Sequence, residues 1–292
     1  MPGFTNRRRQ TDGDKPSFAN RRAAIRAKLR SGMVADMTTD PLSLFSLSGR
    51  TALITGASSG LGERFAEVLH ALGATVVVSA RRADRLDALV ERLGDRAIAV
   101  ACDVAEPGAS AALVQQTIQR AGSLDVVVAN AGIANTVPAI KEQVSDFAKV
   151  VTVDLVAPFE LAQSAAAFWR SKQQAGSIVM IASVAGHLSD KLLPQAGYVA
   201  AKTGLVGLTR ELALQWGRYG IRVNALCPGM FPSEMTAPVH ENPEIAAAFG
   251  AAAPLGRIGQ RHELDGAIAF LASDASSYMT GQSVIVDGGL NT

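Results

Sequence analysis

Aromatic residues, cysteine and unbalanced charge are all scarce in this sequence, and each scarcity argues against a class of protein. Aromatic residues make up 5% of the 292 residues, too few for the stacking platform of a single-stranded nucleic-acid-binding protein. The formal net charge of +2 is too small for a general nucleic-acid-binding surface. Hydrophobic residues reach 48% and charged residues 18%, so the chain has enough apolar material for a large core and is not globally disordered.

The sequence also gives little indication of disulfides, metal sites or membrane-spanning segments. Cys102 and Cys227 are far apart in apolar stretches, which predicts buried thiols in a reducing compartment rather than a disulfide framework. The four histidines show no metal-ligand spacing, so we expect no metal site. The longest apolar runs are strand-sized, well below the roughly 20 residues of a membrane span, and no secretory signal follows the basic N-terminus. These absences predict a soluble, cytoplasmic protein without a membrane or nucleic-acid partner.

The first 40 residues differ in composition from the rest. Residues 1–36 hold nine Arg and Lys against three Asp, so the positive charge of the chain lies there and the remainder is acidic overall. This segment has almost no apolar face with which to dock, which predicts a basic, disordered extension; a targeting or docking role is the alternative. Met33 or Met37 could also be the true start, because the folded pattern begins near Leu42.

From Thr51 onward, strand-like apolar runs alternate with segments of helical spacing. The runs are apolar almost without interruption, as parallel strands covered on both faces are. This alternation predicts a doubly wound α/β fold in a single domain, residues 41–292. The expected strands are Thr51–Thr55, Thr75–Ala80, Ala97–Ala101, Leu124–Ala129, Ser177–Ala182, Arg222–Cys227 and Ser283–Asp287. The helical segments between them include Leu61–Leu72, Ala109–Ala121, Phe147–Arg170 and Tyr198–Tyr219.

The first expected strand runs into a glycine-rich turn, Thr55-Gly56-Ala57-Ser58-Ser59-Gly60-Leu61-Gly62. Its glycines permit a sharp turn, close approach of the backbone to a pyrophosphate, and close packing of helix on strand. The helix that follows presents free N–H groups and the positive end of its dipole to phosphates. The spacing is not the usual G-x-G-x-x-G, so the turn alone is a moderate indication of a dinucleotide site; a glycine-rich turn without a ligand is the alternative.

Tyr198 and Lys202 form a second notable pair. Residues four apart share a helix face, so the ammonium can lie near the phenol and favour loss of its proton. Tyr198 is then suited to give or take a proton at a carbonyl or alcohol oxygen. Ser183 follows a buried strand, where its hydroxyl can stabilise charge that develops on the same oxygen. An acyl nucleophile is disfavoured because Ser183 lacks the G-x-S-x-G turn, and we expect His187 to be a pocket wall or a solvated loop residue.

These motifs, with others in the same order over residues 47–292, resemble the short-chain dehydrogenase/reductase (SDR) family. The shared motifs are the glycine turn, Asn130-Ala131-Gly132, Ser183, the Tyr-x-x-x-Lys of Tyr198 and Lys202, Pro228-Gly229, and Val286-Asp287-Gly288-Gly289. The resemblance implies a Rossmann-type fold with a seven-stranded parallel sheet flanked by helices, and an oxidoreductase with a nicotinamide cofactor. The cofactor-binding residues that it implies are Gly56, Ser58, Ser59, Gly60, Leu61, Gly62, Asp103, Val104, Asn130, Gly132, Tyr198, Lys202, Pro228, Gly229 and Ser233.

The resemblance also implies a mechanism. Hydride passes between the nicotinamide C4 (the 4-pro-S hydrogen) and a substrate carbon, while Ser183 polarises the substrate oxygen and Tyr198 moves the proton. Lys202 holds the ribose hydroxyls and favours the tyrosinate. Asp154 stands where the family has Asn as a fourth catalytic residue. A carboxylate near Lys202 would stabilise the ammonium but offset its pull on Tyr198, so we expect Asp154 to modify the proton relay without abolishing it. The alternative is that Asp154 only caps or bends its helix.

The end of the second strand predicts NADP(H) in preference to NAD(H). An NAD-binding fold places Asp or Glu there to bind the ribose 2′-OH, whereas this chain has Ala80. Arg81 is best placed to pair with a 2′-phosphate, helped by Arg82. An exposed basic loop is the alternative.

The substrate is a small molecule whose identity stays open. The segment Met230–Leu255 is expected to cap the pocket, with Met230, Phe231, Met235 and Phe249 as apolar walls for a medium-sized ketone or alcohol. The segment from Cys227 to Thr236 also resembles that of relatives acting on gluconate-type sugar acids and on 3-oxoacyl thioesters. The loop His187–Gln195 makes the interval from Ser183 to Tyr198 two residues longer than the family's, so we expect it to reshape the pocket.

Three further expectations concern the protein as a whole. The long, Ala-rich helices Phe147–Arg170 and Tyr198–Tyr219 suit a homotetramer or homodimer, as is usual in the family. A catalytically silent dinucleotide sensor is the main rival function, although the intact Ser183, Tyr198 and Lys202 argue against it. A sugar-nucleotide epimerase is disfavoured because the turn does not read T-G-x-x-G-x-x-G.

Overall fold

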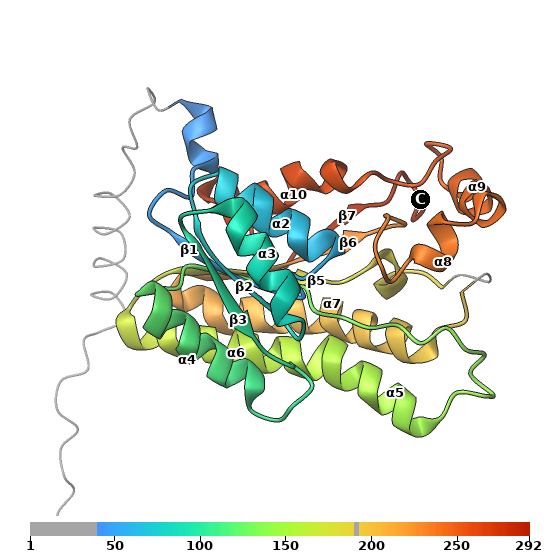
Figure 1. Ribbon diagram of the computed structural model, residues 1–292, viewed down its shortest axis with the longest axis horizontal. Coiled ribbons are helices and arrows are strands. Elements are labelled where there is room, and N and C mark those ends of the chain that lie inside the picture. Colours follow the sequence, from blue (N-terminus) through green and yellow to red (C-terminus); the bar gives the residue numbers. More distant parts are fainter. Residues whose placement is uncertain (1–39, 190–192) are drawn as a thin grey trace, which may run out of the picture. The chain divides into compact units, whose positions relative to one another are not determined.

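The structure is a computed structural model that describes residues 40–189 and 193–292. The predicted basic extension lies, up to residue 39, outside the described residues. Leu44–Thr292 form one compact unit, which contains the sheet and its helices (Figure 1).

The sheet of this unit has seven parallel strands in the order β3-β2-β1-β4-β5-β6-β7. The prediction of a doubly wound, seven-stranded parallel sheet is therefore confirmed. The chain crosses from β3 at one edge to β4 beside β1, so the strand order reverses at β1 and β4, where α/β folds bind ligands. The strands are β1 Thr51–Thr55, β2 Thr75–Ala80, β3 Ala97–Ala101, β4 Val126–Ala129, β5 Gly176–Ile181, β6 Ile221–Pro228 and β7 Ser283–Val286.

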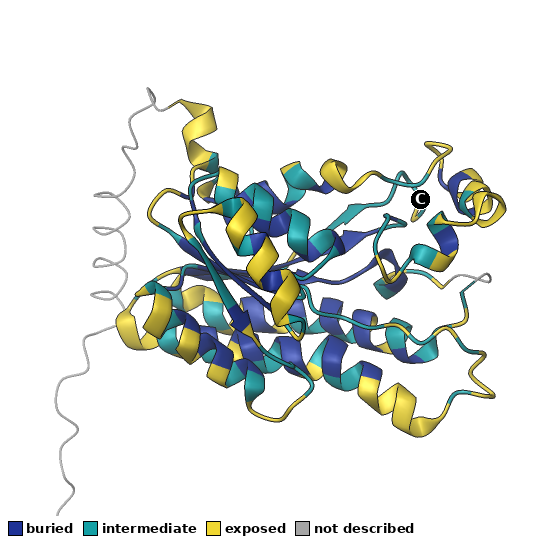
Figure 2. Cartoon of the chain, in the orientation of Figure 1, coloured by how far each residue is buried: buried dark blue, intermediate teal, exposed yellow. Residues whose placement is uncertain are grey.

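Helices cover both faces of the sheet (Figure 1). One hydrophobic cluster lies between the sheet and α2, α3 and α10, and a second lies between the sheet and α4, α6 and α7. All residues of β1, β4 and β5 are buried, which explains their uninterrupted apolar sequence (Figure 2). The helices are α2 Gly60–Ala71, α3 Ala83–Leu93, α4 Ala109–Ala121, α5 Val144–Val151, α6 Ala157–Lys172, α7 Ala196–Trp216, α8 Ala237–His240, α9 Pro243–Ala252 and α10 Asp265–Ala272.

The predicted helix Phe147–Arg170 is longer than expected and contains a π-helical turn, Thr152–Val156, between α5 and α6. Such turns interrupt the regular backbone ladder and are frequent at functional sites. This turn carries Asp154 and packs against α7. The whole stretch Val144–Lys172 is also long and apolar enough to cross a membrane by length and composition, although its uninterrupted apolar runs are short. Half of its most apolar window is buried, and its helices pack against α4 and α7.

Candidate active site

A cavity of about 590 Å³ opens at the carboxyl ends of the strands. The glycine turn, the end of β2, the ends of β4 and β5, the start of α7 and the loop after β6 all contribute to its wall. Every residue predicted to bind the cofactor lines this cavity, as do Ser183, Tyr198 and Lys202. Asp154 is the one predicted site residue that does not line it, because its side chain lies fully buried behind Lys202.

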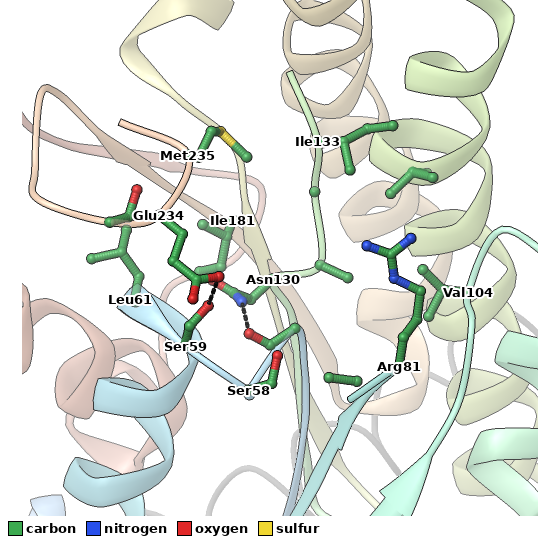
Figure 3. Close-up of a pocket in the computed structure, with 18 of the residues that line it drawn as sticks. Ser58, Ser59, Leu61, Arg81, Val104, Asn130, Ile133, Ile181, Glu234 and Met235 are labelled. Carbon is green, nitrogen blue, oxygen red and sulfur yellow. Dashed lines mark hydrogen bonds between the residues drawn. The ribbon is translucent and has the colours of Figure 1, made fainter. Parts of the chain in front are cut away.

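The glycine turn is held against the end of β4. Asn130 Nδ2 donates hydrogen bonds to the Thr55 carbonyl at 2.8 Å and the Gly56 carbonyl at 3.3 Å. A Cβ at Gly62 would overlap both Asn130 Nδ2 and the Gly56 carbonyl oxygen, so this position needs glycine. The Asn130 side chain therefore fixes the shape of the turn (Figure 3).

The chemistry of this wall fits an adenine dinucleotide. The start of α2 brings the positive end of its dipole and free backbone N–H groups to the cavity. The buried Ser79 hydroxyl also lines the cavity and has no hydrogen-bond partner among the described residues. Asp103 lies at the same wall, where its Oδ1 accepts a hydrogen bond from the Ala105 N–H at 3.0 Å.

Ser183, Tyr198 and Lys202 line the part of the cavity that we call its catalytic end. Lys202 Nζ lies 5.4 Å from the centre of the Tyr198 ring, as their spacing on α7 predicts. The Ser183 Oγ accepts a hydrogen bond from the Ala185 N–H at 3.1 Å, so its own proton is available to a substrate oxygen. Lys202 is 3% exposed, and its Nζ donates a hydrogen bond to the Ile181 carbonyl at 2.9 Å.

Asp154 forms a buried ion pair with Lys202. Its Oδ2 lies 3.1 Å from Lys202 Nζ, and its Oδ1 accepts a hydrogen bond from the Ile133 N–H at 2.8 Å. Gly132 makes room for the carboxylate, because a Cβ there would come within 2.8 Å of Oδ2. Burial raises the pKa of Asp154 above its ordinary value even though Lys202 and the Ile133 N–H pull it down. Burial is the largest single influence on the pKa of Lys202 and lowers it, but the Asp154 carboxylate, together with Tyr198 and Cys227, raises it, and the net direction is upward.

A second carboxylate–cation cluster lies beside the glycine turn, in the part of the cavity formed by Ser58, Ser59 and Arg82, which we call its phosphate end. Glu234, in the loop after β6, accepts hydrogen bonds from Arg82 at 2.8 and 3.2 Å and from the Ser59 hydroxyl at 2.9 Å. Arg85 forms an ion pair with the same carboxylate. The Arg82 hydrogen bonds, helped by Ser59 and Arg85, hold the pKa of Glu234 at about 2. Arg81 extends toward Val104, across the cavity from Glu234 (Figure 3).

Among the charged residues that line the cavity, Glu106, Lys149 and Glu234 were not anticipated. Lys149 could have been found, because it lies one helical turn before Val153 and the two share a face that lines the cavity. No local pattern identifies Glu234, since its partner Arg82 is 152 positions away.

The expected walls are only partly confirmed. Phe231 and Met235 line the main cavity, whereas Met230 and Phe249 line a separate cavity of about 80 Å³. His187 is exposed and faces Cys227, with 3.6 Å between Nε2 and Sγ, so it is placed as a loop residue. Burial raises the pKa of the Cys227 thiol to about 11, so this thiol stays protonated at neutral pH.

Comparison with known proteins places this site in a family. Residues 56–291 match the family described as Enoyl-(Acyl carrier protein) reductase. The chain is 37% identical over 247 residues to the 3-oxoacyl-[acyl-carrier-protein] reductase FabG of Rickettsia prowazekii, covering 85% of this chain and 99% of that protein. A short-chain type dehydrogenase/reductase from Mycobacterium marinum has a TM-score of 0.82 at 34% identity, covering 86% of this chain and 99% of the other. A gluconate 5-dehydrogenase from Burkholderia cenocepacia, in complex with NADP and tartrate, has a TM-score of 0.81 at 35% identity, covering 86% and 98%.

The chain belongs to the short-chain dehydrogenase/reductase family. It is an NAD(P)-dependent oxidoreductase that interconverts ketones and alcohols. The rival function of a silent sensor has no support among these relatives, which are named as reductases and dehydrogenases.

Proposed function

We propose that this enzyme uses NADP(H) in preference to NAD(H) and interconverts a ketone and a secondary alcohol with Ser183, Tyr198 and Lys202. The observation that carries the proposal is the cavity itself. One wall has the glycine turn and two arginines, and the other has a serine, a tyrosine and a buried lysine.

The chemistry divides between the cofactor and the chain. A bound nicotinamide supplies the hydride to the substrate carbon, or accepts it in the reverse direction. Ser183 donates a hydrogen bond to the substrate oxygen and stabilises the charge that develops there. Tyr198 gives its proton to that oxygen in reduction and takes it back in oxidation.

Lys202 acts through its charge and its remaining N–H group. Its ammonium has three donors, of which one goes to the Ile181 carbonyl and another faces Asp154. The third is free to bind a ribose hydroxyl, and the positive charge stabilises the tyrosinate left by proton transfer. Asp154 is a positioning residue in this scheme, because it holds Lys202 and touches neither substrate nor cofactor.

The end of β2 supports NADP(H) preference. Ala80 leaves no carboxylate to bind a ribose 2′-OH, and Arg81 makes no ion pair with any residue that the structure describes. The gluconate 5-dehydrogenase similar to this chain was solved with NADP. Arg81→Asp should reverse the NADP/NAD ratio of kcat/KM, and Arg218→Asp, away from the cavity, should leave it unchanged. An unchanged ratio in Arg81→Asp would refute the assignment.

The substrate is proposed to be a 3-oxoacyl thioester, a sugar acid or another medium-sized carbonyl compound. The names of the relatives supply the first two classes. Phe231 and Met235 add apolar surface to the cavity. A panel of 3-oxoacyl thioesters, keto sugar acids and simple ketones, followed at 340 nm in both directions, tests the proposal. No turnover of any of these compounds would count against it.

We also propose a homotetramer or homodimer in which the first 36 residues are dispensable. Val156, at the end of the π-helical turn, is 52% exposed, and Leu214 on α7 is 80% exposed. Apolar side chains left in water on long helices suit a symmetric interface. Light scattering of the full chain and of one that starts at Met37 tests both points. A monomer, or an inactive shorter chain, would contradict them.

A further inference from the structure

The carboxylate of Glu234 is bound by the groups that otherwise suit a phosphate. Arg82 approaches it with two guanidinium nitrogens, Ser59 with a hydroxyl, and Arg85 with a third cationic nitrogen. The same Arg82 guanidinium donates to the Ser58 hydroxyl at 2.9 Å, which ties it to the glycine turn. Two arginines and a serine that converge on one anion form an oxyanion cradle.

The position of this cradle is the second part of the argument. Ser59 immediately precedes α2, and Arg82 immediately precedes α3, so the Glu234 carboxylate lies near the positive ends of two helix dipoles. The Ser59 side chain does not cap α2, so its hydroxyl is free to donate to Glu234. A Cβ at Gly60 would come 3.2 Å from Ser233 Cβ, so the loop that carries Glu234 lies directly against the glycine turn.

Arg81 and Arg82 are therefore not equivalent. Arg81 lies across the cavity from Glu234 and has no ion-pair partner in the described part of the chain (Figure 3). Arg82 already has an anionic partner that belongs to the protein. A 2′-phosphate bound at the end of β2 would therefore contact Arg81, which has no ion-pair partner among the described residues, and Arg82, whose charge is offset by Glu234.

We propose that Glu234 limits the preference for NADP(H) over NAD(H), because its carboxylate competes with the 2′-phosphate for Arg82. This inference rests on the proposed function, in which Arg81 and Arg82 recognise the 2′-phosphate. The competition needs an exchangeable ion pair, and the side chains of Arg82 and Glu234 are 40% and 49% exposed. Exposed pairs of this kind are weak, so a dianionic phosphate can displace the carboxylate.

Glu234→Gln tests the role of the charge, since glutamine keeps the size and the hydrogen-bonding oxygen. Binding of NADP+ and NAD+ is measured by isothermal titration calorimetry, with 2′,5′-ADP and 5′-AMP as probes that differ only in the 2′-phosphate. We expect NADP+ and 2′,5′-ADP to bind about threefold to fivefold more tightly to the variant, and NAD+ and 5′-AMP to change by less than about twofold. An unchanged or smaller NADP+/NAD+ ratio of affinities would overturn the inference.

Two further variants complete the test. Glu241→Gln, an exposed glutamate with no ion pair in the part of the chain that the structure describes, should behave as the parent. In the Arg82→Gln background, Glu234→Gln should no longer change the ratio, because the cation for which the two anions compete is gone. A full effect in that background would refute competition for Arg82.

The two proposals fail in different ways. If Arg81→Asp and Arg82→Gln leave the NADP+/NAD+ ratio of affinities unchanged, these arginines do not bind the 2′-phosphate. The proposed basis of the NADP(H) preference is then refuted. If they lower the ratio while Glu234→Gln does nothing, only the role of Glu234 fails.

Discussion

The two ends of the cavity use the same kind of ion pair in opposite environments. At the catalytic end, the side chains of Lys202 and Asp154 are 4% and 0% exposed. At the phosphate end, Arg82 and Glu234 are about half exposed. A buried pair is strongly destabilising to break, because the remaining charge loses both water and partner. An exposed pair contributes little stability, so it is free to exchange for a ligand.

The two carboxylates show the difference directly. Burial raises the pKa of Asp154 despite the adjacent lysine, whereas the hydrogen bonds from Arg82 lower that of Glu234 to about 2. Each carboxylate faces a cation, so the direction of each pKa shift depends on whether the carboxylate is buried or exposed to solvent. The buried ion pair therefore fixes the position of Lys202 at the catalytic end, whereas the exposed pair allows a phosphate to replace the Glu234 carboxylate at the phosphate end.

The largest expected effect comes from a change that spares both ion pairs. Tyr198→Phe removes the proton donor, and we expect kcat to fall by about 10²- to 10⁴-fold while NADP+ binding changes little. Steady-state kinetics and calorimetric titration of NADP+ measure the two quantities. Tyr278→Phe is the matched control, because Tyr278 is fully exposed. Retained turnover in Tyr198→Phe would refute the assigned proton donor.

Breaking the buried pair should cost both activity and stability. Lys202→Met leaves the Asp154 carboxylate without its cation, and we expect a loss of about 3–5 kcal/mol in the free energy of unfolding at pH 7. Adding Asp154→Leu removes the stranded charge, so the double variant should recover stability but not activity. Denaturant unfolding and kcat measure the two outcomes. An unchanged free energy of unfolding in Lys202→Met alone would show that the Lys202–Asp154 ion pair does not contribute the stability expected from its burial.

The sheet and most of the cavity wall could be predicted from the sequence because their causes are local. The bounds of β1, β2 and β3 are those expected from uninterrupted apolar runs, and the glycine turn and Tyr-x-x-x-Lys pair are short-range patterns. The partners of Asp154 and Glu234 depend on how distant segments pack. The Asp154 carboxylate faces Lys202 because a π-helical turn packs against α7; the resemblance to the family, and not local spacing, predicts this contact. No local spacing indicates the contact of Glu234 with Arg82.

The charge of Asp154 should appear in the pH dependence of the reaction. Asp154→Asn keeps the shape of the side chain but removes a negative charge that offsets the charge of Lys202. Tyr198 then holds the proton that it donates in reduction less tightly. We expect activity to be retained and the basic limb of the kcat/KM profile for reduction to move to lower pH. Asp146→Asn, exposed on α5, serves as the control.

Two results would contradict this account of Asp154. A profile that superimposes on the parent's would refute the electrostatic part. Complete loss of activity in a folded Asp154→Asn would show that the carboxylate has a role that the family's asparagine does not supply.

The smallest effect is expected for the stability of Glu234→Gln. The pKa of Glu234 is lowered in the folded protein from 4.5 to about 2, so its stabilising contribution is present above the ordinary pKa and is lost as the pH falls toward the folded value. Because both side chains are half exposed, we expect the parent and the variant to differ by less than about 1 kcal/mol at pH 7. Urea unfolding from pH 7 to pH 3.5 should show that difference shrinking below about pH 4.5. A difference as large as that of Lys202→Met, or one that grows as the pH falls, would mean that Glu234 is a structural tie that a phosphate cannot readily displace.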